Sequence, residues 1–93
     1  MIDVKHLNNE TRGEFVAMID NKQAGLMTYT WAGETRFIID HTEVDPAYGG
    51  KGVGKEMVFK AVEFARKKDI KILPLCPFAK ATFEKFPEIQ DVL

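Results

Sequence analysis

This sequence predicts one α/β domain of the α+β type, a mixed five-stranded sheet with helices packed on it in the order β-β-β-β-α-β-α. Up to Asp45, apolar and polar residues alternate in short segments, as they do in strands. Beyond Pro46 the apolar residues recur at helical spacing. The 93 residues, 45% of them hydrophobic, supply one modest core, so we expect residues 1–93 to form a single domain.

Four short strands are expected in the first half of the chain. Period-two alternation and residues that favour strands, such as Thr, Tyr and Trp, mark each of them. Polar or glycine-containing segments separate them, and residues 20–23 suit a hairpin turn. Strands joined by such short turns form an antiparallel meander. The expected strands are Ile2–Leu7, Glu14–Asp20, Ala24–Trp31 and Arg36–Val44.

The second half predicts a helix, a strand and a second helix. An apolar stripe runs from Gly52 to Ala65, and the basic residues 66–68 suit the negative end of that helix, where we expect them to be solvated. Residues 70–75 are almost wholly apolar and predict a buried strand. Proline suits the first turn of a second helix over 77–86, and residues 88–93 predict a short final turn. The first helix then forms a crossover that makes its two flanking strands parallel.

The composition of the chain indicates which binding partners and which cellular compartment to expect. The net charge is −1, from 13 basic and 14 acidic residues, which gives no reason to expect a nucleic acid or a membrane as partner. No apolar run approaches the length of a membrane span, and Met1–Lys5 does not read as a signal peptide. The single cysteine, Cys76, suits a reducing compartment, so we expect a cytoplasmic protein.

A glycine-rich turn between the fourth strand and the first helix is the strongest functional signal. Four glycines within residues 49–54 let the backbone adopt positive φ and come close to a ligand. The helix that follows offers unpaired N–H groups and a positive dipole end, which together favour an anion. Lys51 and Lys55 add positive charge. One or two glycines would suffice for a tight turn alone, so four favour a phosphate lying close to the backbone.

Two common phosphate-binding motifs fit this turn poorly. Gly49-x-x-x-x-Gly54-Lys55 satisfies the first part of the P-loop, but Glu56 stands where Ser or Thr would bind magnesium. The glycine that completes the dinucleotide fingerprint is missing after Gly52, and one βαβ unit cannot build its crevice. Neither an NTPase nor a dinucleotide-binding fold is therefore predicted.

A third motif fits well. The segment Val44-x-Pro46-x-x-Gly49-Gly50-Lys51-Gly52-Val53-Gly54 resembles the coenzyme A pyrophosphate loop of the GNAT superfamily of N-acetyltransferases, and residues 76–85 resemble that family's Asn-x-x-Ala-x-x-x-Tyr-Glu-Lys. The resemblance implies a minimal GNAT fold that binds acetyl-coenzyme A as co-substrate, with no metal. The coenzyme-binding residues that it implies are Val44, Gly49, Gly50, Lys51, Gly52, Val53, Gly54, Lys55, Ala79 and Phe83.

The sequence also departs from the family pattern. The helices that the family places between its first two strands are absent, and they commonly help to bind the acceptor. Gly49 replaces the usual Arg or Gln, and Phe83 replaces the Tyr that commonly protonates the departing thiolate. The chain is similar to the small single-domain branch of the superfamily, whose suspected active groups are a histidine in the fourth strand and a cysteine after the fifth. His41 and Cys76 match them here.

Two chemical routes follow for acetyl transfer to an amine. His41 is expected near the end of its strand, in phase with Phe37, Ile39 and Glu43, where the two parallel strands part. Cys76 begins the second helix, whose positive end stabilises a thiolate, so Cys76 activated by His41 could carry the acetyl group. Alternatively the amine attacks directly, with His41 or Glu43 as general base.

The resemblance therefore implies an N-acetyltransferase of the acyltransferase class EC 2.3.1. Its acceptor would be an amine on a small molecule or a protein. The alternative is a module that binds or senses coenzyme A or acyl-coenzyme A without turnover, which the missing acceptor-side helices and Phe83 favour. The candidate catalytic residues are Cys76, His41 and Glu43.

Overall fold

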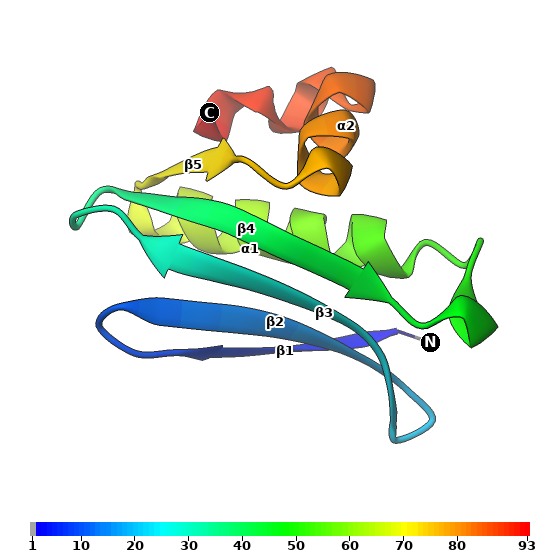
Figure 1. The fold of residues 1–93 in the computed structure, drawn as a ribbon. Helices are drawn as coiled ribbons and strands as arrows, with labels where there is room; N and C mark the ends of the chain where they lie inside the picture. The colour runs from blue at the N-terminus through cyan, green and yellow to red at the C-terminus, as the bar shows by residue number, and fades with distance from the viewer. Residues whose placement is uncertain (1) are drawn as a thin grey trace.

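A computed structural model describes residues 2–93 and contains one five-stranded sheet in the order β1-β2-β3-β4-β5 (Figure 1). Most predicted elements are confirmed, with boundaries that differ by two residues or fewer. The elements are β1 (Asp3–Asn8), β2 (Arg12–Ile19), β3 (Lys22–Trp31), β4 (Arg36–Val44), η1 (Pro46–Tyr48), α1 (Val53–Lys68), β5 (Lys71–Pro74), α2 (Pro77–Lys85) and η2 (Pro87–Val92).

Strands β1 to β4 form the predicted antiparallel meander. The turn between β2 and β3 is tighter than predicted, because Lys22 already belongs to β3. Asp20 and Asn21 make this turn with φ of 51° and 66°. Asp and Asn tolerate this left-handed conformation better than other residues with a side chain, and it matches the twist of a two-residue hairpin.

Helix α1 connects two parallel strands, as predicted. The β4–β5 ladder runs from Arg36 opposite Lys71 to Ile39 opposite Pro74. Asp69 ends α1 in the left-handed conformation, and the chain enters β5 directly. This crossover places the start of α1 near the C-terminal end of β4. The glycine-rich turn, which joins the two, lies at the same end of the sheet (Figure 1).

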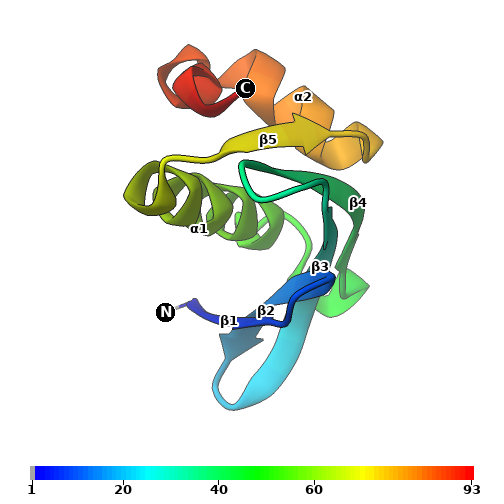
Figure 2. The ribbon, with the colours of Figure 1, turned by 90° about the vertical axis from the view of Figure 1, so that its left-hand side faces the viewer.

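One face of the sheet carries the helices. Figure 2 shows α1 against one side of the strands, with α2 above it beside β5. Buried side chains of β2 to β5, α1, α2 and η2 meet in one hydrophobic cluster, in which Phe37, Met57 and Ala79 are fully buried. The opposite face of β1 to β4 carries none of the described helices. Among residues 2–93, no helix is long and apolar enough to cross a membrane.

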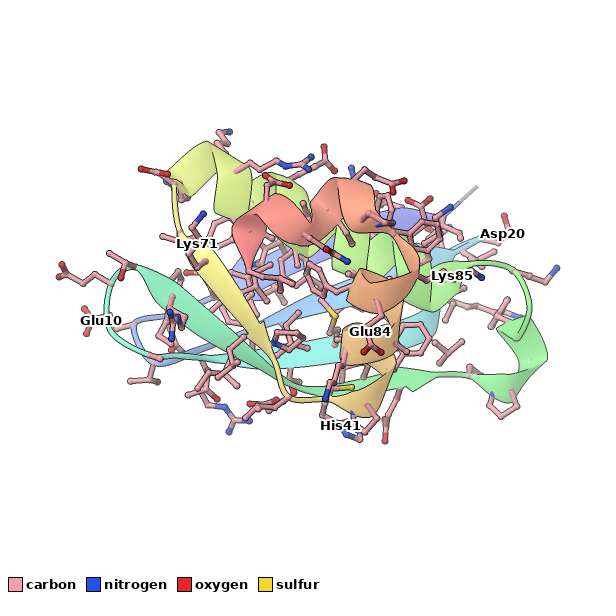
Figure 3. All side chains as sticks on the ribbon, turned by 90° about the horizontal axis from the view of Figure 1, so that it is seen from above. Glu10, Asp20, His41, Lys71, Glu84 and Lys85 are labelled. Atoms are coloured by element: carbon pink, nitrogen blue, oxygen red, sulfur yellow. The ribbon has the colours of Figure 1, made fainter. Side chains whose placement is uncertain are left out.

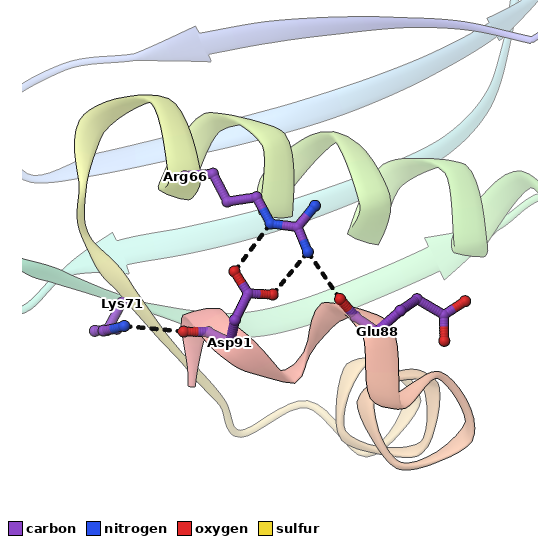
Figure 4. Close-up of polar contacts among 4 residues, drawn as sticks. All are labelled: Arg66, Lys71, Glu88 and Asp91. Atoms are coloured by element: carbon purple, nitrogen blue, oxygen red, sulfur yellow. Dashed lines mark hydrogen bonds and ion pairs between the residues drawn. The ribbon is translucent and has the colours of Figure 1, made fainter.

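The C-terminal segment is tied to the end of α1 (Figure 4). Arg66 donates from Nε and Nη2 to the two carboxylate oxygens of Asp91, at 3.0 and 2.7 Å, and from Nη2 to the carbonyl of Glu88 at 2.8 Å. Lys71 donates to the carbonyl of Asp91 at 2.9 Å. The hydrogen bonds from Arg66 lower the pKa of Asp91. The expectation of a merely solvated basic helix end is thus wrong for Arg66.

An aromatic cluster surrounds His6 on the covered face. The His6 ring stacks on Phe15 with a centroid separation of 4.1 Å and meets the edge of Phe64 at 4.4 Å. Its Nε2 is hydrogen-bonded to the Tyr29 hydroxyl at 2.6 Å. Burial lowers the pKa of His6 and raises the pKa of Tyr29 to about 12. The folded protein therefore prefers a neutral imidazole at this position.

We expect the stability of the fold to depend on this imidazole. The unfolded chain, whose His6 titrates near the ordinary value of 6.5, binds the proton more readily than the folded chain. The free energy of unfolding should therefore be at its full value above pH 6.5 and fall as the pH drops toward 5. Urea denaturation at a series of pH values measures this slope.

A single substitution assigns the slope to His6. His6→Gln should flatten the decline between pH 7.5 and 5, because it removes the imidazole that the folded chain keeps neutral. An unaltered slope in His6→Gln would show that other groups cause the pH dependence.

Candidate coenzyme A-binding and acyl-transfer site

The conformation of the glycine-rich turn is set by its own backbone. Asp45 accepts a hydrogen bond from the backbone N–H of Ala47 at 2.9 Å and so caps η1. Gly50 and Gly52 then take φ of 78° and 80°, the left-handed region that glycine enters without a steric penalty. Gly52 is the N-cap of α1, and no side chain caps this helix end.

The first turn of α1 therefore presents free donors. The first backbone N–H bonded within the helix is that of Glu56, which pairs with the Gly52 carbonyl at 3.0 Å. The N–H groups of Val53, Gly54 and Lys55 precede it and have no partner in the helix. A Cβ built on Gly50 or Gly52 would meet no atom within 4 Å, so the space beside this backbone is open. The turn suits an anion such as a diphosphate.

Strands β4 and β5 part beside this turn, as predicted. Their pairing stops at Ile39 and Pro74, although β4 continues to Val44. The N–H of Asp45 bonds to the carbonyl of Ala24 in β3. Because backbone groups alternate along a strand, those of Thr42 and Val44 face away from β3, toward the opening that β5 leaves. The opening offers a row of backbone donors and acceptors to an extended ligand.

A β-bulge changes the predicted phase of β4. Thr28 pairs with His41 but Tyr29 pairs with Ile39, so Asp40 is an extra residue in β4. Beyond the bulge, His41 and Glu43 lie on the uncovered face of the sheet, opposite to Ile39. Figure 3 shows the position of His41. The expectation that they would be in phase with Phe37 and Ile39 is wrong, because one added residue turns every later side chain to the other face.

Two threonines hold the carboxylate at the bulge. Asp40 accepts hydrogen bonds from the hydroxyls of Thr28 and Thr30, the latter at 2.7 Å. Burial opposes ionisation of Asp40, but these two bonds and the nearby Arg12 outweigh it and lower the pKa of Asp40. The bulge therefore carries a fixed negative charge on the uncovered face.

His41 and Glu43 form a pair on that same face. His41 Nε2 lies 3.0 Å from Glu43 Oε1, with side chains 58% and 67% exposed. A hollow of about 530 Å³ lies at this end of β3 and β4, and Gly25, Leu26 and Glu43 are among the residues that line it. The pair can orient an imidazole toward a molecule that approaches from the uncovered face.

Cys76 has a different partner from the one predicted. It is the N-cap of α2, is only 5% exposed, and its thiol donates to Thr42 Oγ1 at 3.3 Å. Thr42 points to the covered side of β4, whereas His41 points to the uncovered side. The predicted contact of Cys76 with His41 is therefore absent from the described residues. Thr42 was not among the predicted site residues, since only the bulge turns it toward Cys76.

Two residues of α2 that are expected to bind coenzyme A lie in the core. Ala79 is fully buried and Phe83 is 2% exposed. Their side chains pack inside the protein, and their role in binding the coenzyme stays a prediction. Phe78, which was not predicted, is 42% exposed and lies so close to Gly54 that a Cβ there would overlap its ring. A larger residue than glycine at position 54 would therefore displace the Phe78 ring.

The two predicted lysines differ in their surroundings. Lys51 is exposed within the turn itself. Lys55 belongs to α1, and its ammonium lies over the rings of Phe59 and Phe86, 5.3 and 4.8 Å from their centroids. Among residues 2–93, no three His, Cys, Asp or Glu side chains gather closely enough to hold a metal ion.

Comparisons with known proteins support the fold described above. A GCN5-like protein from Staphylococcus aureus, solved by NMR, is 34% identical, with a TM-score of 0.71 over 97% of this chain and 85% of its own. Protein NATD1 of Gallus gallus is 25% identical over 92% of this chain and 77% of its own length. A GNAT family acetyltransferase from Elizabethkingia anophelis with acetyl-CoA bound shares only the fold, at 11% identity and a TM-score of 0.68 over 78% of this chain.

Length separates this chain from the larger enzymes of the same fold. It spans 62% of one such acetyltransferase, 39% of another and 63% of the Elizabethkingia protein. The family model for GCN5-related N-acetyltransferases matches residues 14–92, from β2 to η2, and so includes both the glycine-rich turn and the opening between β4 and β5. The chain belongs to the GCN5-related N-acetyltransferase family.

Proposed function

We propose that this protein transfers an acetyl group from acetyl-coenzyme A to an amine. The observation that carries the proposal is the open glycine turn at the start of α1, beside the parting of β4 and β5. The turn offers backbone N–H groups to a diphosphate, and the opening offers backbone groups to the pantetheine arm. The acetyl-CoA bound to the Elizabethkingia relative supports the same ligand for this fold.

Backbone groups supply most of this proposed binding site. Gly49, Gly50 and Gly52 shape the turn, and Lys51 adds a positive charge. The backbones of Thr42 and Val44 line the opening through which the thioester would reach the face that carries His41. Val53 and Gly54 contribute N–H groups, while their side-chain positions are buried.

Direct attack by the amine is the route that the geometry favours. The amine nitrogen bonds to the acetyl carbonyl carbon, the carbon–sulfur bond breaks, and the coenzyme leaves as a thiol that gains the proton lost by the amine. His41 takes the proton from the amine and passes it on to the departing thiolate, and Glu43, 3.0 Å from Nε2, positions the imidazole. Both lie on the uncovered face, where an acceptor has access, and Glu43 lines the hollow.

The route through Cys76 is a second candidate, favoured by the position of the thiol at the N-terminus of α2. There Cys76 would form an acetyl thioester and release coenzyme A, and the amine would then form the amide and restore the thiol. The thiol is 5% exposed and bonded to Thr42, so this route requires a local opening that the direct route does not need.

A turnover assay with variants separates the routes. The protein is incubated with acetyl-coenzyme A and a panel of amines, and both the acetylated amine and the intact protein are measured by mass spectrometry. We expect product without a stable adduct on the protein. His41→Gln should lower kcat by about a hundredfold, the usual worth of a general base, while Cys76→Ser stays close to wild type.

Each of the other possible results of this assay leads to a different conclusion. An acetyl adduct that disappears in Cys76→Ser would overturn direct transfer in favour of the thiol route. Coenzyme binding without product from any amine would favour a module that only binds or senses acyl-coenzyme A, for which the Phe at position 83 is an argument. A Glu43→Gln variant that loses less activity than His41→Gln supports a positioning role for Glu43.

Two further expectations belong to this proposal. We infer that residues 1–93 act as one domain, since the buried side chains from β2 to η2 meet in one cluster. A single free cysteine suits a reducing compartment, which favours the cytoplasm. The acceptor is an amine of a small molecule or of a protein.

A further inference from the structure

An apolar groove lies along the outer edge of the sheet, between β5 and the helical segments α2 and η2. Its volume is about 580 Å³, and Leu73, Leu75 and Leu93 are among the residues that line it. These three side chains are 39%, 61% and 50% exposed. Five large hydrophobic residues are exposed among residues 2–93, so more than half of them share this groove. Exposed apolar side chains that gather in one place are typical of a surface that binds another protein.

The backbone of β5 is poorly suited to pairing with an additional strand. β5 is the last strand of the sheet and pairs only with β4. The N–H of Lys71 bonds to the Thr35 carbonyl on the side of β4, so the backbone groups of Ile72 and Pro74 face the free edge. Ile72 is only 2% exposed, and proline has no N–H to donate. An extended peptide would find few backbone partners here, so the groove favours a partner that binds through side chains.

Two charged side chains of α2 make the groove complementary to itself. Lys80 and Glu84 both line it, and their spacing of four residues places them on one face of the helix. Both are exposed, and the ion pairs found among residues 2–93 involve neither of them. Figure 3, which looks onto this edge of the sheet, shows Glu84 on α2 beside β5. When two copies meet about a two-fold axis with antiparallel α2 helices, Lys80 of each copy lies opposite Glu84 of the partner subunit.

We propose that this groove is the interface of a homodimer, in which two copies pack α2 and the end of β5 against each other about a two-fold axis. The leucines of each copy cover the groove of the other and so remove apolar surface from water. The ion pair between Lys80 and Glu84 of the partner subunit occurs twice, once on each side of the axis. An interface built on one groove of this size is small, so we expect a dissociation constant in the micromolar range.

The dimer does not depend on the proposed function. The glycine-rich turn, residues 49–54, is not part of the groove, and the hollow beside Glu43 is lined by other residues. Both copies therefore keep these two surfaces free, and the interface can be measured on the full chain without any ligand.

Sedimentation velocity of the full chain, from micromolar to millimolar concentrations, tests the interface. We expect a reversible rise from the mass of one chain toward the mass of two. Leu75→Gln/Leu93→Gln should weaken the dimer at least about tenfold, because it exposes polar groups where apolar area would be buried in both copies. Leu7→Gln is the matched control: this leucine is 58% exposed on β1, at the opposite edge of the sheet, and its variant should dimerise like the wild type.

Charge reversal tests how the two copies are aligned. Lys80→Glu alone and Glu84→Lys alone should each weaken the dimer about tenfold, because each places like charges opposite each other across the axis. Lys80→Glu/Glu84→Lys restores two opposite-charge pairs and should dimerise like the wild type. Single variants that dimerise normally, or a double variant weakened by the sum of both, would overturn the pairing of α2 with α2.

Three results would overturn the dimer as a whole. The first is a mass that stays at that of one chain up to millimolar concentration, in which case the groove would belong to a different protein. The second is a dimer that survives Leu75→Gln/Leu93→Gln, and the third is one that Leu7→Gln abolishes, which would place the contact at β1. Circular dichroism and urea denaturation at low concentration check that each variant keeps the monomer fold, as expected for exposed side chains.

Discussion

Gly52→Val is expected to abolish coenzyme A binding, with affinity reduced at least about a hundredfold, which corresponds to the loss of one or two charge-assisted hydrogen bonds. Gly52 has φ of 80° and directly precedes the first turn of α1. A β-branched residue cannot hold this conformation without strain, so the turn shifts and the N–H groups of Val53 and Gly54 no longer converge. Titration with coenzyme A measures the effect.

Gly33→Val is the matched control for this change. Gly33 has φ of 81°, and a Cβ there would meet no atom within 4 Å, as at Gly52. It lies between β3 and β4, at the far end of β4 from the glycine turn. Both variants should lose about 1–2 kcal/mol of stability from the left-handed backbone, yet only Gly52→Val should lose the ligand. Retained affinity in Gly52→Val would refute the placement of the diphosphate.

Gly13→Ala is expected to destabilise the fold by about 3 kcal/mol, the upper range for overpacking a core. Gly13 pairs with Tyr29 across β2 and β3, and a Cβ on it would overlap the Tyr29 ring. Tyr29 is fully buried and hydrogen-bonded to His6, so the ring cannot move without breaking that bond. A loss of this size is a large part of the stability of a small domain. Urea denaturation measures it.

Two comparisons test the cause. Gly49→Ala should change stability little, because Gly49 has φ of −61° and the nearest atom to its Cβ would be the Pro46 carbonyl oxygen at 3.4 Å. In a Tyr29→Leu background, which removes the ring atoms that a Cβ at position 13 would overlap, Gly13→Ala should cost much less than in the wild type. An equal cost in both backgrounds would assign the effect to the backbone of β2 instead.

The elements themselves could be predicted from the sequence because their signals are local. The period of two in the first half gave the meander, and the change of period after Pro46 gave α1. Gly50 and Gly52 marked the open turn, since few other residues adopt positive φ readily. The parallel pairing of β4 with β5 followed from the crossover rule.

The side-chain partners of the candidate site could not be predicted. A period-two reading places His41 on the face of Ile39, but the extra residue Asp40 moves it to the other face. Cys76 and Thr42 are 34 positions apart in sequence, and their hydrogen bond exists only because β4 and α2 pack side by side. Bulges leave no clear sequence signal.

The sequence by itself determined the fold class, the glycine-rich turn at the start of α1 and the candidate residues. Turn geometry and periodicity depend on neighbouring residues, so one chain suffices to read them. Only the tertiary structure decided that His41 pairs with Glu43 rather than with Cys76, and that three exposed leucines gather in the groove beside β5. Such contacts join residues from different elements, and a one-residue shift in a strand or the end of a helix is enough to change them.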